Sequence, residues 1–261
     1  MRALNSTLIT GASEGIGRCF AEEFAKHGHD LIQVARKAEK LKVLATELQI
    51  NYQVKVSVYP CDLTQADAID SLYQQILADG GLVDILVNNA GVMCVDDFVY
   101  AEPNELERLL QLNIQALVNM TRTFLPDMVL RESGKVVNIG SVASFIPTPK
   151  FAVYGASKAF VLSFSEALSE EVKEIGVAIH CVCPGFTHTQ MLMAGKGLET
   201  IIPQFLKVPP ESLVRDAYKA IMKGETLYVD KFHNKLLVQW AQLYPRWLVR
   251  GVSGFLSRLK D

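Results

Sequence analysis

The sequence predicts an α/β fold in which helices cover both faces of a parallel β-sheet. Seven short apolar runs recur along the chain, and helical patterns fill the segments between them. This alternation is typical of a parallel sheet with helical crossovers, and no repeat, low-complexity tract or linker suggests a second domain. The expected strands lie near residues 5–10, 30–35, 54–59, 84–88, 135–140, 177–183 and 226–230, and the expected helices near 15–27, 38–49, 66–79, 103–131, 152–175 and 210–223.

Composition argues against several other classes of protein. The chain has 261 residues, of which 49% are hydrophobic and 21% charged, and its net charge is −2. It can therefore bury a large core, and nothing global indicates a nucleic-acid partner. The five cysteines form no C-x-x-C pair and the five histidines are scattered, which predicts reduced thiols in a cytoplasmic protein and no metal site. We expect neither a signal peptide nor a membrane-spanning helix.

Three glycines follow the first expected strand and open the first helix, in Thr10-Gly-Ala-Ser-Glu-Gly-Ile-Gly17. Gly11, Gly15 and Gly17 would let the chain turn sharply, let amides approach a pyrophosphate, and let helix pack against strand. The helix N-terminus would attract the anion. The spacing differs from the generic G-x-G-x-x-G fingerprint, so an ordinary glycine turn is the alternative.

The end of the second strand bears on the choice of dinucleotide. A protein that binds unphosphorylated NAD usually has Asp or Glu here, about 20 residues past the glycines, to hold the ribose 2′-hydroxyl. Residues 32–37 contain no carboxylate and carry Arg36 and Lys37 instead. A guanidinium suits a 2′-phosphate, which favours NADP(H); the alternative is a solvated charge at a helix start.

Polar residues also follow the next two strands. Asp62 follows the third strand, where its carboxylate suits either an adenine amino group or the cap of the next helix. Asn88-Asn-Ala-Gly91 ends the fourth strand, at the edge where a ligand crevice is expected, although Asn and Gly also form plain turns. Asn113 lies within an apolar helical pattern, where a polar side chain needs a partner.

The segment from Ser141 to Lys158 carries the chemistry. Ser141 follows the fifth strand, and Tyr154 and Lys158 are four residues apart at the start of a helix, so they share one face. An ammonium beside a phenol favours phenolate and would lower the pKa of Tyr154. A serine hydroxyl in reach would hold an oxygen, a combination suited to carbonyl–alcohol chemistry. Alone, Y-x-x-x-K is equally an exposed helix pair.

Taken together, these stretches resemble the short-chain dehydrogenase/reductase family over about residues 4–230. The resemblance implies a Rossmann-type fold with a doubly wound, seven-stranded parallel sheet, spanning an oxidoreductase domain of residues 1–232. It implies a catalytic tetrad in which Tyr154 is the general acid or base and Ser141 positions the substrate oxygen. Lys158 would hold the nicotinamide ribose and lower the pKa of Tyr154, and Asn113 would hold a water in a proton relay.

The resemblance also implies a set of cofactor contacts. Small residues of the glycine turn would meet the phosphates, residues after the second to fourth strands the adenosine half, and residues after the sixth strand the nicotinamide. The set is Gly11, Ser13, Gly15, Ile16, Gly17, Arg36, Asp62, Leu63, Asn89, Ala90, Gly91, Tyr154, Lys158, Pro184, Gly185, Thr187 and Thr189. Members of the family commonly pair through two crossover helices, so we expect a homodimer or homotetramer.

Two apolar segments suggest the substrate. The family places a mobile lid near residues 189–210, which here carry Met191, Met193 and several Ile, Leu and Phe residues. Phe145, Ile146, Pro147 and Phe151 are candidates for the opposite wall; the alternative is that both segments only close the core. We expect a medium to large apolar carbonyl or secondary alcohol, because the lid has no arginine to bind a short acid.

Residues 233–261 depart from a minimal member of the family. Apolar residues including Trp240, Trp247 and Phe255 fall at helical intervals, and Pro245 should interrupt the helix. Residues 231–261 carry six Lys or Arg and one Asp. This basic amphipathic extension suits an anionic membrane surface, a second subunit or the lid. It is also the one feature favouring a different function, a nucleotide-sensing or membrane-associated binding module with little turnover.

Overall fold

The seven expected strands form one parallel sheet in the computed structural model, which describes residues 5–189, 191 and 203–258. Neighbouring strands follow the order β3-β2-β1-β4-β5-β6-β7, and every pair is parallel. The strands are β1 (Ser6–Thr10), β2 (Asp30–Ala35), β3 (Val56–Pro60), β4 (Ile85–Asn88), β5 (Gly134–Ile139), β6 (Val177–Cys183) and β7 (Leu227–Val229). The direction of winding reverses between β1 and β4, which opens a ligand crevice at their carboxyl ends.

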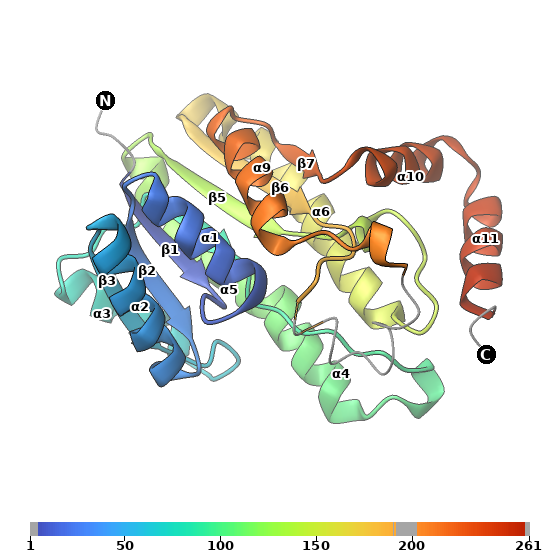
Figure 1. Ribbon diagram of the computed structural model, residues 1–261, viewed down its shortest axis with the longest axis horizontal. Coiled ribbons are helices and arrows are strands. Elements are labelled where there is room, and N and C mark those ends of the chain that lie inside the picture. The colour runs from blue at the N-terminus through green and yellow to red at the C-terminus, as the bar shows by residue number, and fades with distance from the viewer. Residues whose placement is uncertain (1–4, 190, 192–202, 259–261) are drawn as a thin grey trace.

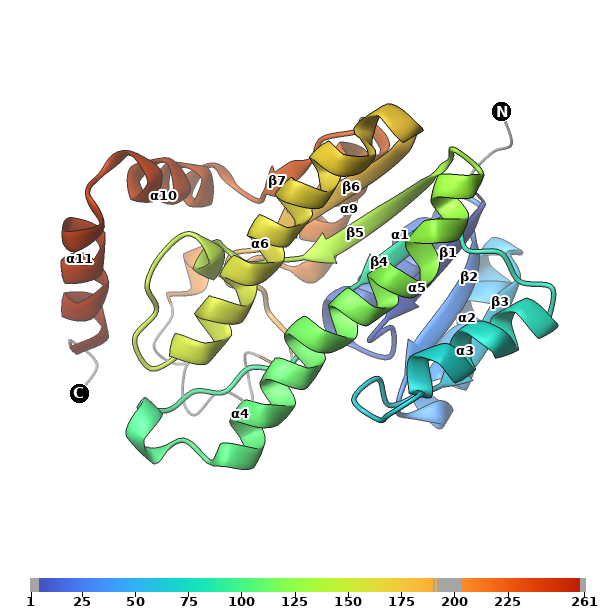
Figure 2. The same ribbon diagram turned by 180° about the vertical axis from the view of Figure 1, so that it is seen from behind.

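Helices cover both faces of the sheet, as the sequence predicts (Figures 1 and 2). On one face lie α1, α2 and α9; on the other lie α3, α5 and α6, with α4 leading into α5. The longer helices are α1 (Gly15–Lys26), α2 (Ala38–Tyr52), α3 (Ala68–Ala78), α4 (Pro103–Leu110), α5 (Leu117–Leu130), α6 (Ala152–Val172), α9 (Pro210–Met222), α10 (Phe232–Leu243) and α11 (Arg246–Arg258). The Rossmann-type prediction is therefore confirmed.

Most boundaries lie within three residues of the predictions, and two differences have a clear structural cause. The pattern at 103–131 is not one α-helix, because a π-helical turn at Gln111–Ala116 joins α4 to α5. The third helix begins at Ala68 rather than near 66 because a separate turn, held by Asp62, comes first. As predicted, Pro245 separates the two helices of the C-terminal extension. Among the described helices, none combines the length and apolar character needed to cross a bilayer.

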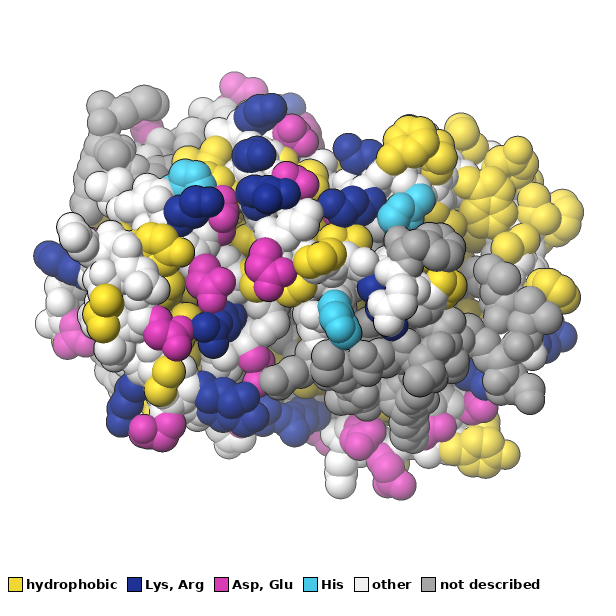
Figure 3. All heavy atoms as spheres, viewed as in Figure 1, with side chains coloured by type: hydrophobic (Ala, Val, Ile, Leu, Met, Phe, Trp, Pro, Cys, Tyr) yellow, Lys and Arg dark blue, Asp and Glu magenta, His cyan; other side chains and the backbone are white. Residues whose placement is uncertain are grey.

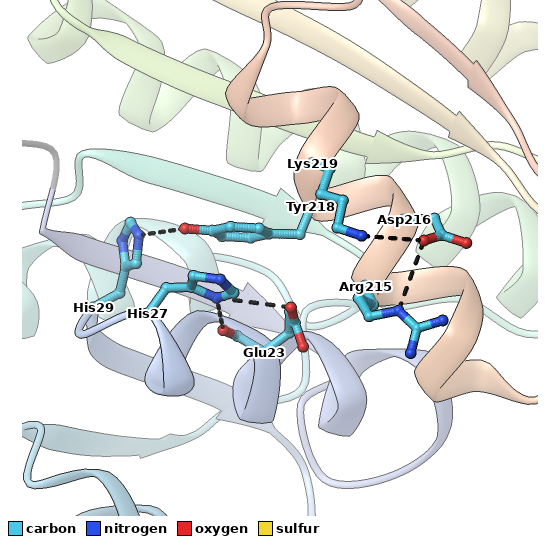
Figure 4. Close-up of polar contacts among 7 residues, drawn as sticks. All are labelled: Glu23, His27, His29, Arg215, Asp216, Tyr218 and Lys219. Atoms are coloured by element: carbon cyan, nitrogen blue, oxygen red, sulfur yellow. Dashed lines mark hydrogen bonds and ion pairs between the residues drawn. The ribbon is translucent and has the colours of Figure 1, made fainter.

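An aromatic cluster fixes α9 against α1 (Figure 4). Tyr218 of α9 lies with its hydroxyl 3.3 Å from Nε2 of His29, while the ring of His27 stacks on it at 4.2 Å between centroids. Phe24 packs edge-on against the same ring, at 5.1 Å. Burial lowers the pKa of His29, so this histidine is neutral near pH 7. The cluster fixes the position of α9 relative to the end of α1. The next strand after α9 is β7.

Gln33, in the middle of β2, is an exception to the apolar core. Its side chain is fully buried, and neither amide atom has a hydrogen-bond partner among the residues described. A buried amide without partners destabilises a fold. We expect Gln33→Met, which keeps the length of the side chain, to raise the free energy of unfolding by about 1–2 kcal/mol, measured by urea denaturation.

The matched control for Gln33→Met is Gln74→Met on an exposed face of α3. It removes the same amide group at a solvent-exposed position, where we expect the free energy of unfolding to change by less than about 0.5 kcal/mol. A loss of stability in Gln33→Met would contradict the interpretation and show that the amide is hydrogen-bonded in solution.

Candidate active site

A cavity of about 460 Å³ lies at the carboxyl edge of the sheet. Its walls come from the turn after β1, from the ends of β2 to β6, and from α4, α6 and α11. The volume is within the usual range for a small-molecule site. The predicted site residues that line it are Gly11, Ser13, Gly15, Ile16, Arg36, Asp62, Leu63, Asn89, Ala90, Gly91, Ser141, Tyr154, Lys158, Pro184, Gly185, Thr187 and Thr189. Gly17 and Asn113 stand behind this lining.

The glycine turn is shaped for close backbone approach. Gly11 and Gly15 adopt φ values of +66° and +59°, a region that favours glycine. A Cβ on Gly17 would lie 2.3 Å from the Gly11 carbonyl oxygen and 2.4 Å from Nδ2 of Asn89. Only glycine therefore lets the start of α1 pack this closely beneath the turn. Thr189 closes the turn from the cavity side, 3.5 Å from where a Cβ on Gly15 would lie.

Asn89 and Thr10 tie the turn to the end of β4. The Asn89 amide donates from Nδ2 to the Thr10 carbonyl at 2.9 Å. The Thr10 hydroxyl accepts from the backbone N–H groups of Asn89 and Ala90, each at 3.0 Å. These bonds join segments that lie almost 80 residues apart in sequence, and they fix the glycine turn to the end of β4. Asn89 therefore connects the two strand ends, a structural role that its place in a turn-forming sequence did not predict.

Positive charge gathers at the end of β2. Arg36 and Lys37 line the cavity beside Glu14, which accepts from Nζ of Lys40 at 2.7 Å. The Lys40 hydrogen bond lowers the pKa of Glu14, with smaller contributions from Lys37 and Arg36. The group holds three cations and one carboxylate, so it favours an additional anion.

Asp62 folds back on its own loop. Its Oδ1 accepts from the backbone N–H of Thr64 at 3.1 Å and from the Thr64 hydroxyl at 2.8 Å. The carboxylate therefore caps a turn rather than the N-terminus of α3, which corrects the capping alternative. It lines the cavity from this position.

Ser141, Tyr154 and Lys158 converge on the cavity as predicted. Ser141 lies two residues beyond β5, where its hydroxyl accepts from the Ala143 N–H at 3.1 Å and hydrogen-bonds the Tyr154 phenol. Lys158 is buried, with its ammonium 5.8 Å from the centroid of the Tyr154 ring. Its Nζ donates to the Ile139 carbonyl at 2.7 Å, so the strand end and the helix are held together at the reacting groups.

The proton affinity of Tyr154 differs from the expectation. Burial raises the pKa of Tyr154, and the hydrogen bond from Ser141 offsets this only in part. Lys158 is directed at the Ile139 carbonyl rather than at the phenolic oxygen, and burial lowers the pKa of Lys158 to about 8. The prediction that Lys158 makes the phenol acidic is therefore wrong for this arrangement. At neutral pH, Tyr154 is protonated, the form that a general acid requires.

Asn113 occupies the π-helical turn between α4 and α5. Its Oδ1 accepts from the Val92 N–H at 2.8 Å, and its Nδ2 donates to the Val92 carbonyl at 2.9 Å and to the Ser157 hydroxyl at 3.2 Å. One amide thus satisfies both backbone groups of the loop after β4. π-Turns of this kind are frequent at functional sites. The side chain does not line the cavity, and it positions the loop that does.

Asp230 is a site residue that sequence reasoning missed. It is fully buried after β7, and its Oδ1 accepts from the Gly185 N–H at 2.8 Å and from Nδ2 of Asn234 at 2.7 Å. Burial raises the pKa of this carboxyl group, and the two hydrogen bonds oppose the rise. The signal was its place at the end of the last strand, on the same edge as the cavity. Asp230 fixes the loop that carries Pro184 and Gly185.

The substrate end of the cavity is largely apolar. Ile146, Pro147 and Phe151 line it as expected, together with Met191. Phe145 does not: it is buried in the core beside α6. Most of the predicted lid, Gln190 and 192–202, lies outside the described residues. Sequence reasoning also missed Arg108 of α4, which adds a cation to this wall.

The C-terminal extension also contributes to the cavity. Ser253 and Ser257, one turn apart on α11, line it, and Val249 on the same face is fully buried. Val238 and Ala241 of α10 join the hydrophobic cluster around α6. The spacing of Val249, Ser253 and Ser257 at every fourth residue was the available signal for this inner side of α11, which packs on the rest of the chain.

Sequence comparison identifies the family. Residues 5–196 match the profile of the short chain dehydrogenase family. The chain belongs to the short-chain dehydrogenases. Among curated members, it is 32% identical to the very-long-chain 3-oxoacyl-CoA reductase of Bos taurus, over 92% of this chain and 76% of that one. It is likewise 32% identical to the Homo sapiens 17-beta-hydroxysteroid dehydrogenase type 3, over 97% and 78%.

Solved structures of other short-chain dehydrogenases share the fold. An enzyme from Sphingobium yanoikuyae in complex with NADPH is 33% identical and superposes with a TM-score of 0.83, over 97% of this chain and 96% of that one. The bulky-bulky ketone specific alcohol dehydrogenase of Comamonas testosteroni is 30% identical, with a TM-score of 0.79, over 92% and 93%. The family, the matching site and these relatives make the chain an oxidoreductase of carbonyl and alcohol groups rather than a non-redox binding module.

Proposed function

We propose that the protein reduces an apolar ketone of medium to large size with NADPH, using Tyr154 as the general acid. The observation that carries this proposal is the convergence of Tyr154, Ser141 and Lys158 on one cavity that also contains the glycine turn. The opposite direction, oxidation of a secondary alcohol, uses the same groups with the proton moving the other way.

The residues present fit a nicotinamide dinucleotide. Gly11 and Gly15 carry no side chains of their own, and a helix N-terminus follows the turn, so backbone N–H groups are available to a pyrophosphate. Pro184, Gly185, Thr187 and Thr189 would hold the nicotinamide end, and Asp62, Leu63 and Asn89 the adenosine end. When bound, the cofactor supplies the hydride.

The chain's own residues would then handle the proton. The Ser141 hydroxyl donates to the substrate oxygen and holds the carbonyl carbon in place. As negative charge develops on that oxygen, the Tyr154 phenol gives up its proton to it. Because burial raises the pKa of Tyr154, the phenol stays protonated until it reacts. The apolar wall at Ile146 and Phe151 excludes water and orients the substrate.

Lys158 and Asn113 would complete the tetrad. Lys158 would hold the ribose hydroxyls of the nicotinamide half through its ammonium, which lies 5.8 Å from the centroid of the Tyr154 ring. Asn113 anchors the loop at Val92 through both backbone groups, and in the proposed role it also keeps a relay water in place. In this scheme Asn113 acts through its neighbours and makes no contact with substrate.

The preference for NADP(H) over NAD(H) is supported by the cations at the end of β2. Arg36 and Lys37 line the cavity where a 2′-phosphate would lie, and the residues from Ile32 to Lys37 contain no carboxylate. We expect Arg36→Ala to raise the Kd for NADPH by about 10- to 100-fold, the loss of one charge-assisted hydrogen bond, with the Kd for NADH almost unchanged.

Fluorescence titration of both reduced cofactors measures this difference, and a panel of ketones of graded size then measures turnover. Lys42→Ala, on the exposed surface of α2 and paired with Glu39, is the matched control and should change neither Kd. Tighter binding of NADH than NADPH by the native protein would contradict the assignment of Arg36.

Three further properties complete the proposal. The protein is a cytoplasmic homodimer or homotetramer that pairs through two helical segments, 103–131 (α4 to α5) and 152–175 (α6 and the turn after it). Residues 1–232 form the catalytic domain, and 233–261 extend it, because α10 and α11 share its core. The substrate is large and apolar, because Met93, Ile146 and Phe151 line that end of the cavity.

A further inference from the structure

The C-terminal extension carries many exposed apolar side chains. Figures 1 and 2 show α10 and α11 projecting from one end of the molecule, and Figure 3 shows hydrophobic side chains gathered over that end. Two of them, Leu243 and Trp247, are 82% and 67% exposed. The exposed apolar set, called here the extension face, comprises Phe232, Leu236, Leu243, Tyr244, Trp247, Val252 and Phe255. Such a concentration marks an interaction surface.

Charge on the extension face is of one sign. From residue 231 to residue 260 the chain has six Lys or Arg and no Asp or Glu. Arg246, Arg250 and Arg258 are all exposed on α11, among the aromatic residues. The chain as a whole has a net charge of −2, so this basic character is local. A partner for this face must offer apolar depth and negative charge together.

The two sides of α11 differ in their surroundings. Val249, Ser253 and Ser257 face the protein, where the serines line the substrate cavity. Trp247 and Phe255, on another side of the helix, are 67% and 61% exposed. The helix is therefore anchored on its inner side, and whatever binds its outer side lies next to the wall of the substrate cavity.

We propose that the extension face docks on an anionic lipid surface, with Trp247 and Phe255 inserted among the acyl chains and the arginines at the headgroups. Helices that lie in a membrane interface combine aromatic residues with cations in this way. Docking would place the cavity at the membrane surface, within reach of an apolar ketone dissolved in lipid. That last consequence rests on the proposed function; the docking itself does not.

A second copy of the chain is a poorer occupant for this face. In a two-fold symmetric pair the same patch meets itself, so the arginines of one extension would approach those of the other. With no carboxylate between residues 231 and 260 to neutralise them, such a contact brings together like charges. An anionic bilayer neutralises the arginines at its headgroups and also accepts the aromatic side chains among its acyl chains.

The chain contains a matched control surface. Phe98, Val99 and Tyr100 are 65%, 79% and 75% exposed, but Asp97 precedes them and Glu102 follows. The apolar exposure is similar and the local charge is opposite. A lipid surface that is anionic should therefore bind the extension face and not this turn.

The test is sedimentation of the full-length protein with vesicles of phosphatidylcholine, with and without about a third of phosphatidylglycerol. We expect binding to the anionic vesicles only, weakened as NaCl rises from about 0.05 to about 0.5 M. The double variant W247S/F255S should partition at least about tenfold less, and R250E about fivefold less or lower. F98S/Y100S should bind like the native protein.

Ketone reduction in lipid-free buffer and light scattering accompany each variant. A native midpoint of urea denaturation shows that W247S/F255S is folded, with or without turnover, so loss of vesicle binding alone supports docking even if the proposed substrate class is wrong. Equal binding by W247S/F255S and the native protein overturns the proposal. So does conversion of this variant from dimer to monomer with unchanged vesicle binding, which would make the face a contact between copies.

Discussion

Tyr154→Phe is expected to lower kcat for ketone reduction by about 10²- to 10⁴-fold, the usual contribution of a general acid. The variant retains the ring that packs in the cavity and removes only the hydroxyl that Ser141 hydrogen-bonds. Because burial keeps the phenol protonated, this hydroxyl is the proton source in the proposed reaction. Steady-state turnover and NADPH titration are the measurements, and we expect the Kd for NADPH to change little.

Tyr73→Phe provides the control for this experiment. The Tyr73 hydroxyl of α3 donates to Asp127 of α5 at 2.8 Å. Tyr73 does not line the cavity. Its removal should leave kcat close to native. If Tyr154→Phe turned over substrate within a few-fold of the native rate, Tyr154 would not be the general acid. A loss of affinity for NADPH would show that the phenol serves cofactor binding instead.

Gly17→Ala is expected to have the largest effect on stability. A Cβ here would lie 2.3 Å from the Gly11 carbonyl oxygen, so the turn or α1 must move. Overpacking of this kind costs about 2–4 kcal/mol of unfolding free energy. Since the same turn would hold the pyrophosphate, we also expect the Kd for NADPH to rise by more than about tenfold. Urea denaturation and cofactor titration measure the two effects separately.

Gly251→Ala is the comparison, since a Cβ at that helical position meets nothing within 4 Å. It should stabilise the chain slightly, by up to about 1 kcal/mol, because Ala is the better helix former. If Gly17→Ala were as stable as the native protein, the close packing of α1 beneath the turn would be absent in solution.

Local sequence patterns accounted for the order and approximate bounds of the strands. Apolar runs flanked by polar residues mark strands buried on both faces, and each predicted run became a strand. They also located Ser141, because residues just beyond parallel strands reach the same edge, and they placed Tyr154 and Lys158 on one helix face. The sequence patterns did not predict the π-helical turn at Asn113, because one inserted residue leaves the spacing of apolar residues in a helix almost unchanged.

The sequence by itself determined the strands, the glycine turn and the set of reacting groups, since each is marked by a pattern of residues near one another in the chain. The tertiary structure decided how those groups behave. Burial, which raises the pKa of Tyr154, and the Ile139 carbonyl, which takes the Lys158 ammonium, depend on atoms from separate elements. The contribution of α11 to the cavity has the same origin: periodicity shows that a helix has two sides, and only packing shows what each side meets.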